Sequence, residues 1–293
     1  MRKNLLSQIK GLITSMRIKQ WTKNLLVFAA LLFSSKYATS AQVIASFVAF
    51  ILFCFTSSSV YLLNDFVDRE ADGLNPEKCH RPMVTGQLNA YVGLLGCIVL
   101  STLTVICGFK LNVLFGVLLL AYLINNLFYS CKLKHVVIMD VMSIAFGFVL
   151  RAVGGGIAIH VKLTPWFLLC TLLLALFLAI GKRRYEIGLL VDSTIQHRQV
   201  LKQYSTQLLD QLNSIVATAA IMSYALYTFT SGKSIAMMFT IPLVIYGIFR
   251  YLYIIHIRNQ GGSPTKILFS DKPILLTVIL YGFSVFVILS NFN

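Results

Sequence analysis

The chain has 293 residues, of which 57 % are hydrophobic and 12 % charged, and its mean hydropathy is +0.79. This composition excludes a soluble globular protein, and repeated apolar runs of about 18–22 residues predict a polytopic helical membrane protein. The runs do not alternate between apolar and polar residues, which excludes a β-barrel. The net charge of +15 raises the alternative of nucleic-acid binding, against which the distribution of the charges argues.

Residues 1–22 predict an amphipathic helix that lies on the membrane surface. Leu5, Ile9, Leu12 and Met16 recur at helical spacing, and basic residues supply the polar side. Such a helix suits an anionic lipid surface. We do not interpret the segment as a signal peptide, because the first long apolar run begins only after Lys23 and no small-residue cleavage site follows it.

Residues 23–293 predict one membrane domain, since no polar segment is long enough for a soluble one. The first spanning segment is the weakest, because Ser34, Ser35 and Lys36 shorten it. Pro273 begins the last, at a position that needs no backbone N–H. The nine predicted segments are about 23–36, 41–63, 90–109, 111–129, 137–159, 163–181, 214–230, 235–256 and 273–291.

Basic residues gather in alternate loops. One side carries clusters such as Lys132 with Lys134, whereas each loop on the other side has a single lysine. By the positive-inside rule the N-terminus is cytoplasmic and the C-terminus lies outside, in a bacterial-type inner or cell membrane. All ten acidic residues then fall on or near the cytoplasmic side. This topology accounts for the positive charge without a nucleic-acid partner.

The six cysteines form no C-x-x-C pair. Four lie in apolar segments as small hydrophobic residues, and two lie in loops assigned to the cytoplasm, where thiols stay reduced. We therefore expect no disulfide and no zinc site.

The acidic motif Asn64–Asp72 is the strongest candidate for chemistry, since five of the ten acidic residues lie in it or just after it. Read as a helix, Asp65, Asp68 and Asp72 share a face, and the outer two are about 10 Å apart along the axis. That spacing is too long for one ion in a compact cage. It suits Mg²⁺ on a bound diphosphate, because Mg²⁺ typically takes one or two carboxylates and completes its shell with water and phosphate oxygens. The alternative is a solvated acidic loop.

Basic side chains next to the motif are candidates for binding phosphate oxygens. Arg81 precedes Pro82 shortly after the motif, with Lys78 and His80 close by. The alternative is that these residues are only part of the positive-inside charge.

The fifth segment carries Asp140 near its cytoplasmic start and Arg151 in its interior. They share a helical face but are about 16 Å apart by rise, so we expect no direct pair. An arginine within the membrane usually marks a polar pathway or a ligand site, and this one leans back toward the cytoplasmic side. The alternative is a structural ion pair.

Two further helix ends carry polar candidates. The fourth segment ends at Tyr129, an interfacial aromatic residue or a site residue, and Lys134 follows as a phosphate partner if it faces the same cavity. The sixth ends in Lys182–Arg184 with Glu186, either a phosphate clamp or a basic helix end that fixes the topology. Gly154–Gly156 permits close helix packing and is not a phosphate loop.

Taken together, these features resemble the UbiA prenyltransferase superfamily over most of the chain. The resemblance rests on the nine segments and on motif residues. Those residues are Asn64, Asp65, Asp68 and Asp72 after the second segment, Arg81 with Pro82, and Tyr129 with Lys134 and Asp140.

The resemblance implies an all-α fold of about nine transmembrane helices around a central cavity that faces the cytoplasm. It also implies a Mg²⁺ cofactor held by Asn64, Asp65, Asp68 and Asp72, with the three aspartates as the catalytic residues.

Within the superfamily the chain is most similar to the decaprenyl-phosphate phosphoribosyltransferase branch, through Lys19–Phe28, Gly147–Val153 and Gly181–Glu186. Members that use a prenyl diphosphate carry a second aspartate-rich motif after the sixth segment. This chain has Lys182–Arg184 there, with only Glu186 as an acid. A basic second site suits phosphoribosyl diphosphate, which bears an additional phosphate.

The resemblance therefore implies transfer of a 5-phosphoribosyl group from phosphoribosyl diphosphate to a membrane polyprenyl phosphate of the decaprenyl type, with release of diphosphate. The acceptor is already an anion, so no strong general base is required. The sequence does not determine the oligomeric state, and a homo-oligomer is one of the alternatives. The residues expected to bind the substrates are Lys19, Lys23, Arg81, Tyr129, Lys134, Asp140, Arg151, Lys182, Arg183, Arg184 and Glu186.

Two alternatives stay open. An aromatic prenyltransferase that uses a polyprenyl diphosphate would need the second acidic motif, which the sequence lacks. A transporter or channel for an anionic solute could use Arg151, but an acidic cluster at its mouth would repel anions unless a metal is bound.

Overall fold

The structure is a computed structural model, and it describes residues 5–33, 39–75, 78–191, 199–232, 234–258 and 260–291. These residues form helices and connecting turns, and no strand occurs among them. Four of the elements are 3-10 helices, named η1 to η4. The elements are α1 Leu5–Ser15, η1 Ile18–Phe28, α2 Ala29–Phe33, α3 Ser40–Val67, α4 Arg69–Gly73, α5 Ala90–Leu111, α6 Val113–Cys131, η2 Leu133–His135, α7 Met139–Ala158, α8 Pro165–Val191, η3 Gln199–Gln203, α9 Thr206–Thr230, η4 Ile235–Thr240, α10 Ile241–His256, α11 Pro264–Ser270 and α12 Lys272–Asn291.

Eight of the described helices are long and apolar enough to cross a membrane, with η4 and α10 counted together. They coincide with eight of the nine predicted segments, so the prediction of an all-helical, polytopic membrane protein is confirmed. The first predicted segment, 23–36, falls on η1 and α2, and its residues 34–36 lie outside the described residues.

Three helices extend past the predicted segments at the end of the bundle that carries the motifs, and one of them, α9, begins at Thr206 rather than near residue 214. α3 continues to Val67 rather than ending near residue 63, and α8 continues to Val191 rather than ending near residue 181. Apolar composition marks only the part of a helix that lies in lipid, whereas backbone hydrogen bonding continues beyond it. The first motif residues and the basic residues after Gly181 therefore lie on helices rather than on loops.

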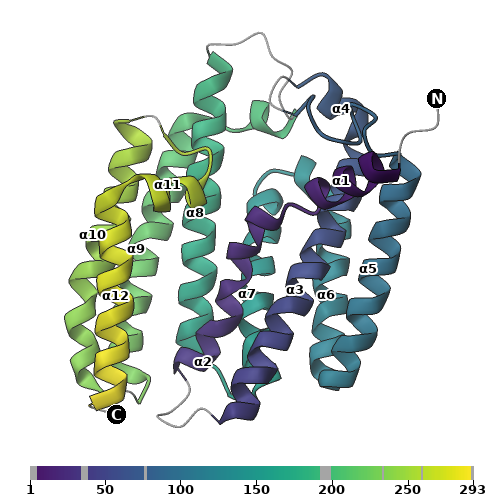
Figure 1. The fold of residues 1–293 in the computed structure, drawn as a ribbon. Coiled ribbons are helices and arrows are strands. Elements are labelled where there is room, and N and C mark those ends of the chain that lie inside the picture. The colour runs from purple at the N-terminus through teal and green to yellow at the C-terminus, as the bar shows by residue number, and fades with distance from the viewer. Residues whose placement is uncertain are drawn as a thin grey trace.

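The helices form two groups (Figure 1). One contains α3, α5, α6 and α7, and the other contains α8, α9, α10 and α12. The groups are joined where α7 packs on α8. η1 and α2 belong to the first group, because they pack on α3 and α7, whereas α12 packs on α10, α11 and η4. In the described part of the chain, the two groups thus meet most closely between α7 and α8.

α1 lies at the same end of the bundle as α4 (Figure 1). It ends at Ser15, whereas the predicted amphipathic helix continues to residue 22. Leu5, Leu6 and Ile9 are exposed, which suits the predicted position on a membrane surface. The opposite side packs on the chain, since a Cβ on Gly11 would lie 3.0 Å from the Cβ of Leu88.

Residues Ile18–Phe28 form a 3-10 helix, η1. Arg17, just before it, adopts the left-handed conformation with φ 52° and ψ 54°, and this turns the chain from α1 into η1. A 3-10 helix has three residues per turn, so side chains three apart share a face. Asn24 and Val27 are buried accordingly, whereas Lys23 and Leu26 line a cavity.

The glycines of α7 allow η1 to pack at backbone contact. A Cβ on Gly155 would lie 2.0 Å from the carbonyl oxygen of Val27, and one on Gly154 would lie 2.6 Å from the Phe53 ring. Real side chains never approach so closely, so only glycine fits. This confirms that Gly154–Gly156 serves close helix packing.

We expect Gly155→Ala to lower the free energy of unfolding by about 1–3 kcal/mol, because the new methyl group displaces backbone and not a flexible side chain. Gly188→Ala on α8 is the matched control, since no atom lies within 4 Å of its added Cβ, and a helical alanine gains up to about 1 kcal/mol over glycine. Thermal unfolding of the purified variants in detergent measures both. Equal unfolding temperatures for the two variants would contradict the close contact between α7 and η1.

Candidate active site

A cavity of roughly 1270 Å³ lies between the two groups of helices. It is larger than the about 300–1,000 Å³ of an ordinary small-molecule site. Among the described residues that line it are five basic ones and no aspartate or glutamate. The five are Arg17, Lys23, Arg151, Lys182 and Arg183. The cavity is therefore positively charged at its polar end and suits anionic ligands.

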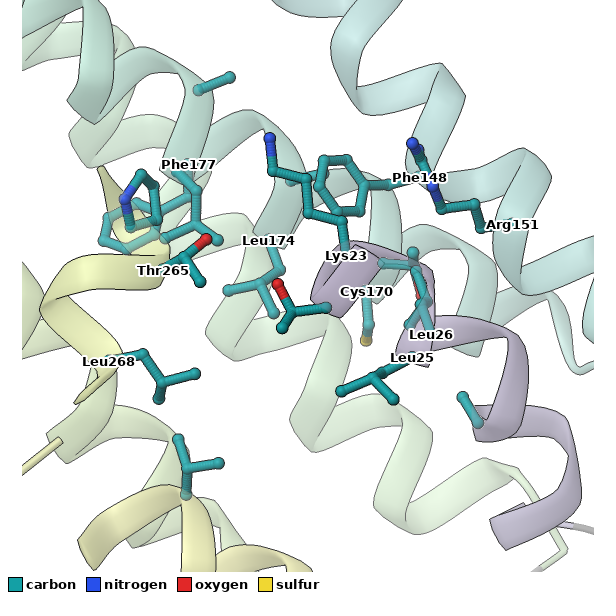
Figure 2. Close-up of a pocket in the computed structure, with 18 of the residues that line it drawn as sticks. Lys23, Leu25, Leu26, Phe148, Arg151, Cys170, Leu174, Phe177, Thr265 and Leu268 are labelled. Atoms are coloured by element: carbon teal, nitrogen blue, oxygen red, sulfur yellow. The ribbon is translucent and has the colours of Figure 1, made fainter. Parts of the chain in front are cut away.

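The rest of the cavity wall is apolar and reaches the outer surface of the bundle. In Figure 2, Leu25, Leu26 and Cys170 lie below Lys23. Leu32 on α2 and Phe286 on α12 also line the cavity, yet they are 62 % and 64 % exposed. Apolar side chains that both line a cavity and face outward mark a lateral opening between α2 and α12. In a membrane such an opening meets the acyl chains.

Behind the polar end, Asp65 and Asp72 share one arginine. Asp65 lies on the last turns of α3 and is 2 % exposed; it pairs with Arg17 and, at 3.1 Å, with Nη1 of Arg81. The same nitrogen of Arg81 also pairs with Asp72, which is 3 % exposed and lies 3.6 Å from Nζ of Lys78. One guanidinium thus bridges two buried carboxylates.

Asp68 and Asn64 contact the end of α6 and η2, which follows it. Asp68 pairs with Lys134 on η2, and the Asn64 side chain accepts a hydrogen bond from the Ser130 hydroxyl. The motif is not one continuous helix, because α3 ends at Val67 and Asp68 forms the turn before α4. The expectation that the three aspartates share one face of a single helix is therefore wrong in detail. Asn64 lines the cavity, and the three carboxylates lie behind it.

The donor atoms of the motif fit Mg²⁺ in kind, because carboxylate and amide oxygens are its preferred protein ligands. In the described part of the chain, no three His, Cys, Asp or Glu side chains are close enough to hold one ion by themselves. The basic partners of Asp65, Asp68 and Asp72 occupy the same oxygens. A metal could therefore bind here only together with a phosphate. The basic groups would then leave the carboxylates and pair with the phosphate oxygens.

Asp140 and Arg183 form a buried ion pair between α7 and α8. Asp140 is fully buried, and its Oδ2 lies 2.6 Å from Nε of Arg183. Nη1 of Arg183 lies 2.5 Å from Glu186, and Nη2 donates to the Tyr129 hydroxyl at 3.5 Å. Arg183 therefore presents one side to the cavity while two carboxylates hold the other.

Tyr204 supports Asp140 from the segment before α9. Its hydroxyl donates to Oδ1 of Asp140 at 2.7 Å and accepts the backbone N–H of Ile138 at 2.6 Å. Burial, with the hydrogen bond to Asp140, raises the pKa of Tyr204, so its hydroxyl stays protonated and donates. Ile138 has φ 69°, which is rare for a β-branched residue, and the Tyr204 hydrogen bond helps to hold it there.

Arg151 is held in the cavity wall without a carboxylate partner in the described structure. It is 6 % exposed, and it donates to Asn24 at 2.7 Å, to the Gly147 carbonyl at 2.9 Å and to the Tyr122 hydroxyl at 2.6 Å. Its guanidinium also lies over the rings of Tyr122 and Phe148. Asp140 pairs with Arg183, so the expectation that Asp140 and Arg151 do not pair holds.

The structure divides the predicted substrate-binding residues into two sets. Those that line the cavity are Lys23, Tyr129, Arg151, Lys182 and Arg183. Those that do not line it are Lys19, Arg81, Lys134, Asp140, Arg184 and Glu186. Within the second set, Arg184 turns away and lies 3.2 Å from Asp210 on α9, and Lys19 is exposed.

Sequence reasoning missed Arg17, Asn24, Tyr122 and Tyr204. Arg17 was grouped with the polar side of the amphipathic helix, although its place at the junction with the first apolar segment could have singled it out. Asn24 is a polar residue in an apolar run, which is a usable signal. Tyr204 has no local signal, because its partner Asp140 lies 64 residues away.

Comparisons with known proteins agree with this architecture. The model of the UbiA prenyltransferase family matches residues 24–270. The chain belongs to this family. It is accordingly a membrane-embedded transferase of the prenyltransferase type, as the resemblance implies.

Two relatives of this UbiA chain carry the name decaprenyl-phosphate phosphoribosyltransferase. One, from Corynebacterium glutamicum, is 33 % identical over 94 % of this chain and 85 % of its own. The other, from Mycolicibacterium smegmatis, is 31 % identical over 92 % of this chain and 88 % of its own. A solved UbiA homolog from Archaeoglobus fulgidus, bound to DMAPP and Mg²⁺, has a TM-score of 0.72 at 20 % identity and covers 96 % of this chain and 99 % of its own. It shares the fold.

We expect Asp140→Asn to lower the free energy of unfolding by about 3 kcal/mol, because it removes one charge of a buried pair. Asp210→Asn is the matched control. Its pair with Arg184 is partly exposed, so the loss should stay below about 1 kcal/mol. Thermal unfolding of both variants without substrates measures the difference. A larger loss in the Asp210 variant would refute the assigned burial.

Proposed function

We propose that this UbiA-family protein transfers the 5-phosphoribosyl group of phosphoribosyl diphosphate to a membrane polyprenyl phosphate and releases diphosphate. The relatives named decaprenyl-phosphate phosphoribosyltransferase, which match almost the whole chain, support this reaction. They also favour an acceptor of decaprenyl type.

The observation that carries the proposal is the composition of the cavity wall. A cationic end without carboxylates adjoins an apolar part with a lateral opening. Both substrates are anionic at the reacting end, and only the acceptor has a long apolar chain. The cationic end of the cavity matches the phosphate groups of both substrates, and the apolar part matches the chain of the acceptor.

The basic end of α8 favours phosphoribosyl diphosphate over a prenyl diphosphate as donor. Lys182 and Arg183 line the cavity there. The acid of this stretch, Glu186, is already bound to Arg183 at 2.5 Å. This stretch has three basic residues and one acid, a composition that suits an additional phosphate better than a second metal.

The reaction breaks the bond between the anomeric carbon and the diphosphate oxygen, and it forms a bond from that carbon to a phosphate oxygen of the acceptor. The electron pair leaves with the diphosphate. The acceptor oxygen is already anionic, so no residue has to remove a proton. The chain's own residues then orient two phosphates and balance their charge.

The residues that would hold Mg²⁺ are Asn64, Asp65, Asp68 and Asp72. When bound, the ion supplies neutralisation of the negative charge that develops on the leaving diphosphate. Arg17, Arg81 and Lys134 already contact these aspartates, so they are in place to exchange a carboxylate for a phosphate oxygen.

The alternation of basic loops supports a cytoplasmic position for the N-terminus and for the motif end of the bundle. A water-soluble sugar diphosphate would enter from that side. The polyprenyl chain would enter from the membrane through the opening between α2 and α12.

Turnover tests the proposal directly. Purified protein is incubated with radiolabelled phosphoribosyl diphosphate and polyprenyl phosphate, with Mg²⁺ or with a chelator. We expect a lipid-soluble labelled product that requires the metal and returns when Mg²⁺ is restored. Consumption of a polyprenyl diphosphate with an aromatic acceptor, and no product from the sugar donor, would assign the protein to the prenyl-transferring members instead.

We expect Asp68→Asn to reduce kcat by about 100-fold or more, because an interaction that stabilises charge in the transition state is lost. Asparagine keeps a hydrogen-bond acceptor for Lys134, so folding should be retained. Asp68 is also the most accessible of the three motif aspartates, with 22 % of its side chain exposed.

Glu70→Gln is the matched control for that variant. Glu70 lies two residues away, its side chain is 94 % exposed, and it contacts only Arg69 at 3.9 Å. Its kcat should equal that of the unmodified protein. Near-normal turnover in Asp68→Asn, or an equal loss in Glu70→Gln, would refute the role of the motif.

A further inference from the structure

Lys23 and Arg151 enter the same cavity from different elements. Lys23 lies on η1 and Arg151 on α7, and both line the cavity. Figure 2 shows the amino group of Lys23 and the guanidinium of Arg151 pointing in the same direction. Two like charges that line one largely apolar cavity repel each other, unless an anion binds between them.

Arg151 has hydrogen-bonding capacity left over. A guanidinium carries five N–H donors, and the described contacts use one on each of its three nitrogens. Two N–H groups therefore have no acceptor in the described structure, although the residue is only 6 % exposed. All three acceptors are neutral, so none of them balances the charge. A buried cation in this state is expensive and points to a missing anion.

Lys23 has no hydrogen-bond or ion-pair partner among the described residues. Its neighbour Arg17 carries the same charge but is paired with Asp65. The other basic residues at this end of the cavity are paired too: Arg183 with Asp140 and Glu186, and Lys182 with Glu186 at 3.7 Å. Lys23 and Arg151 thus differ from every other cation of the cavity wall.

The cavity therefore offers two different environments for anions. Next to the motif, carboxylates and basic groups stand together, which suits a diphosphate that brings a metal. Among the described residues, no carboxylate pairs with Lys23 or Arg151, which suits an anion that binds without a metal. These are the requirements of the donor and of the acceptor, respectively.

The 3-10 geometry of η1 links the second environment to the apolar part of the cavity. Lys23 and Leu26 on η1 and Ala29, the first residue of α2, follow one another at intervals of three, and all three line the cavity. One face of η1 therefore leads from a cation to the lateral opening. A phosphate on a long apolar chain fits this sequence of a cation followed by an apolar surface. A free sugar phosphate would contact only the cation.

We infer that Lys23 and Arg151 form the binding site for the phosphate of the lipid acceptor, a polyprenyl monophosphate, and that this site works without a metal. The inference rests on the proposed function. Lys23 contributes a point charge, and Arg151 contributes its two remaining N–H groups to the phosphate oxygens.

Binding of farnesyl phosphate, a short polyprenyl monophosphate, tests the site. The full-length protein in detergent is titrated by calorimetry with chelator present and no donor. We expect the unmodified protein to bind. Lys23→Gln should weaken binding by about 10- to 100-fold, the effect of losing a charged hydrogen bond. Lys23 has no partner to lose on substitution, so folding is preserved, and the thermal unfolding temperature checks this.

Matched variants separate charge from shape. Lys23→Arg should restore most of the affinity, and Arg151→Lys should weaken it, because a lysine cannot replace the fixed fork of donors. Lys132→Gln, an exposed lysine on the same side of the protein, should bind as the unmodified protein does. Farnesol, which lacks the phosphate, should bind with the same affinity to Lys23→Gln and to the unmodified protein.

Steady-state kinetics distinguishes this site from that of the donor. Lys23→Gln should raise KM for the polyprenyl phosphate and leave KM for phosphoribosyl diphosphate unchanged. Unaltered farnesyl phosphate binding in Lys23→Gln, or a rise in KM for the donor alone, overturns the inference while turnover upholds the proposed function. Absence of binding and of turnover in the unmodified protein overturns both.

Discussion

Charge pairing between the motif aspartates and basic residues from elsewhere in the chain holds the reactive end of the bundle together. Arg17 comes from the N-terminal segment, Arg81 from the connection to α5, and Lys134 from η2. Asp65 and Asp72 are almost fully buried, so leaving either without a partner would be costly. The position of Arg17 also determines where η1 begins, and therefore which residues face the cavity.

In the proposed reaction, the same pairing distinguishes the two substrates. A cation that is paired with a carboxylate can bind an anion only when something else neutralises that carboxylate. A divalent metal is suited to this. Cations without such a partner bind an anion at once. Two negatively charged substrates can therefore bind in one cavity, each at its own site, although both are recognised through phosphate oxygens. The apolar opening adds a further distinction, because only one of the substrates has a chain that fits it.

Much of this could be predicted from the sequence, because it depends on composition and local spacing. Eight spanning helices followed from apolar runs, and the acidic motif and the basic end of α8 followed from their residue types. The pairing of these side chains could not be predicted, because it joins residues that are far apart in the sequence, such as Arg17 and Asp65, or Asp140 and Tyr204. The first segment was predicted, as the weakest of the nine because residues 34–36 shorten it, but its 3-10 form was not.

The 3-10 form of η1 also changes how far a short segment can reach. Each residue of a 3-10 helix rises about 2.0 Å, against about 1.5 Å in an α-helix. The eleven residues of η1 and the five of α2 together extend about 30 Å, close to the thickness of the hydrocarbon core. An α-helix would need about twenty residues for that distance. A 3-10 backbone thus lets these sixteen residues cover the length for which an α-helix needs about twenty.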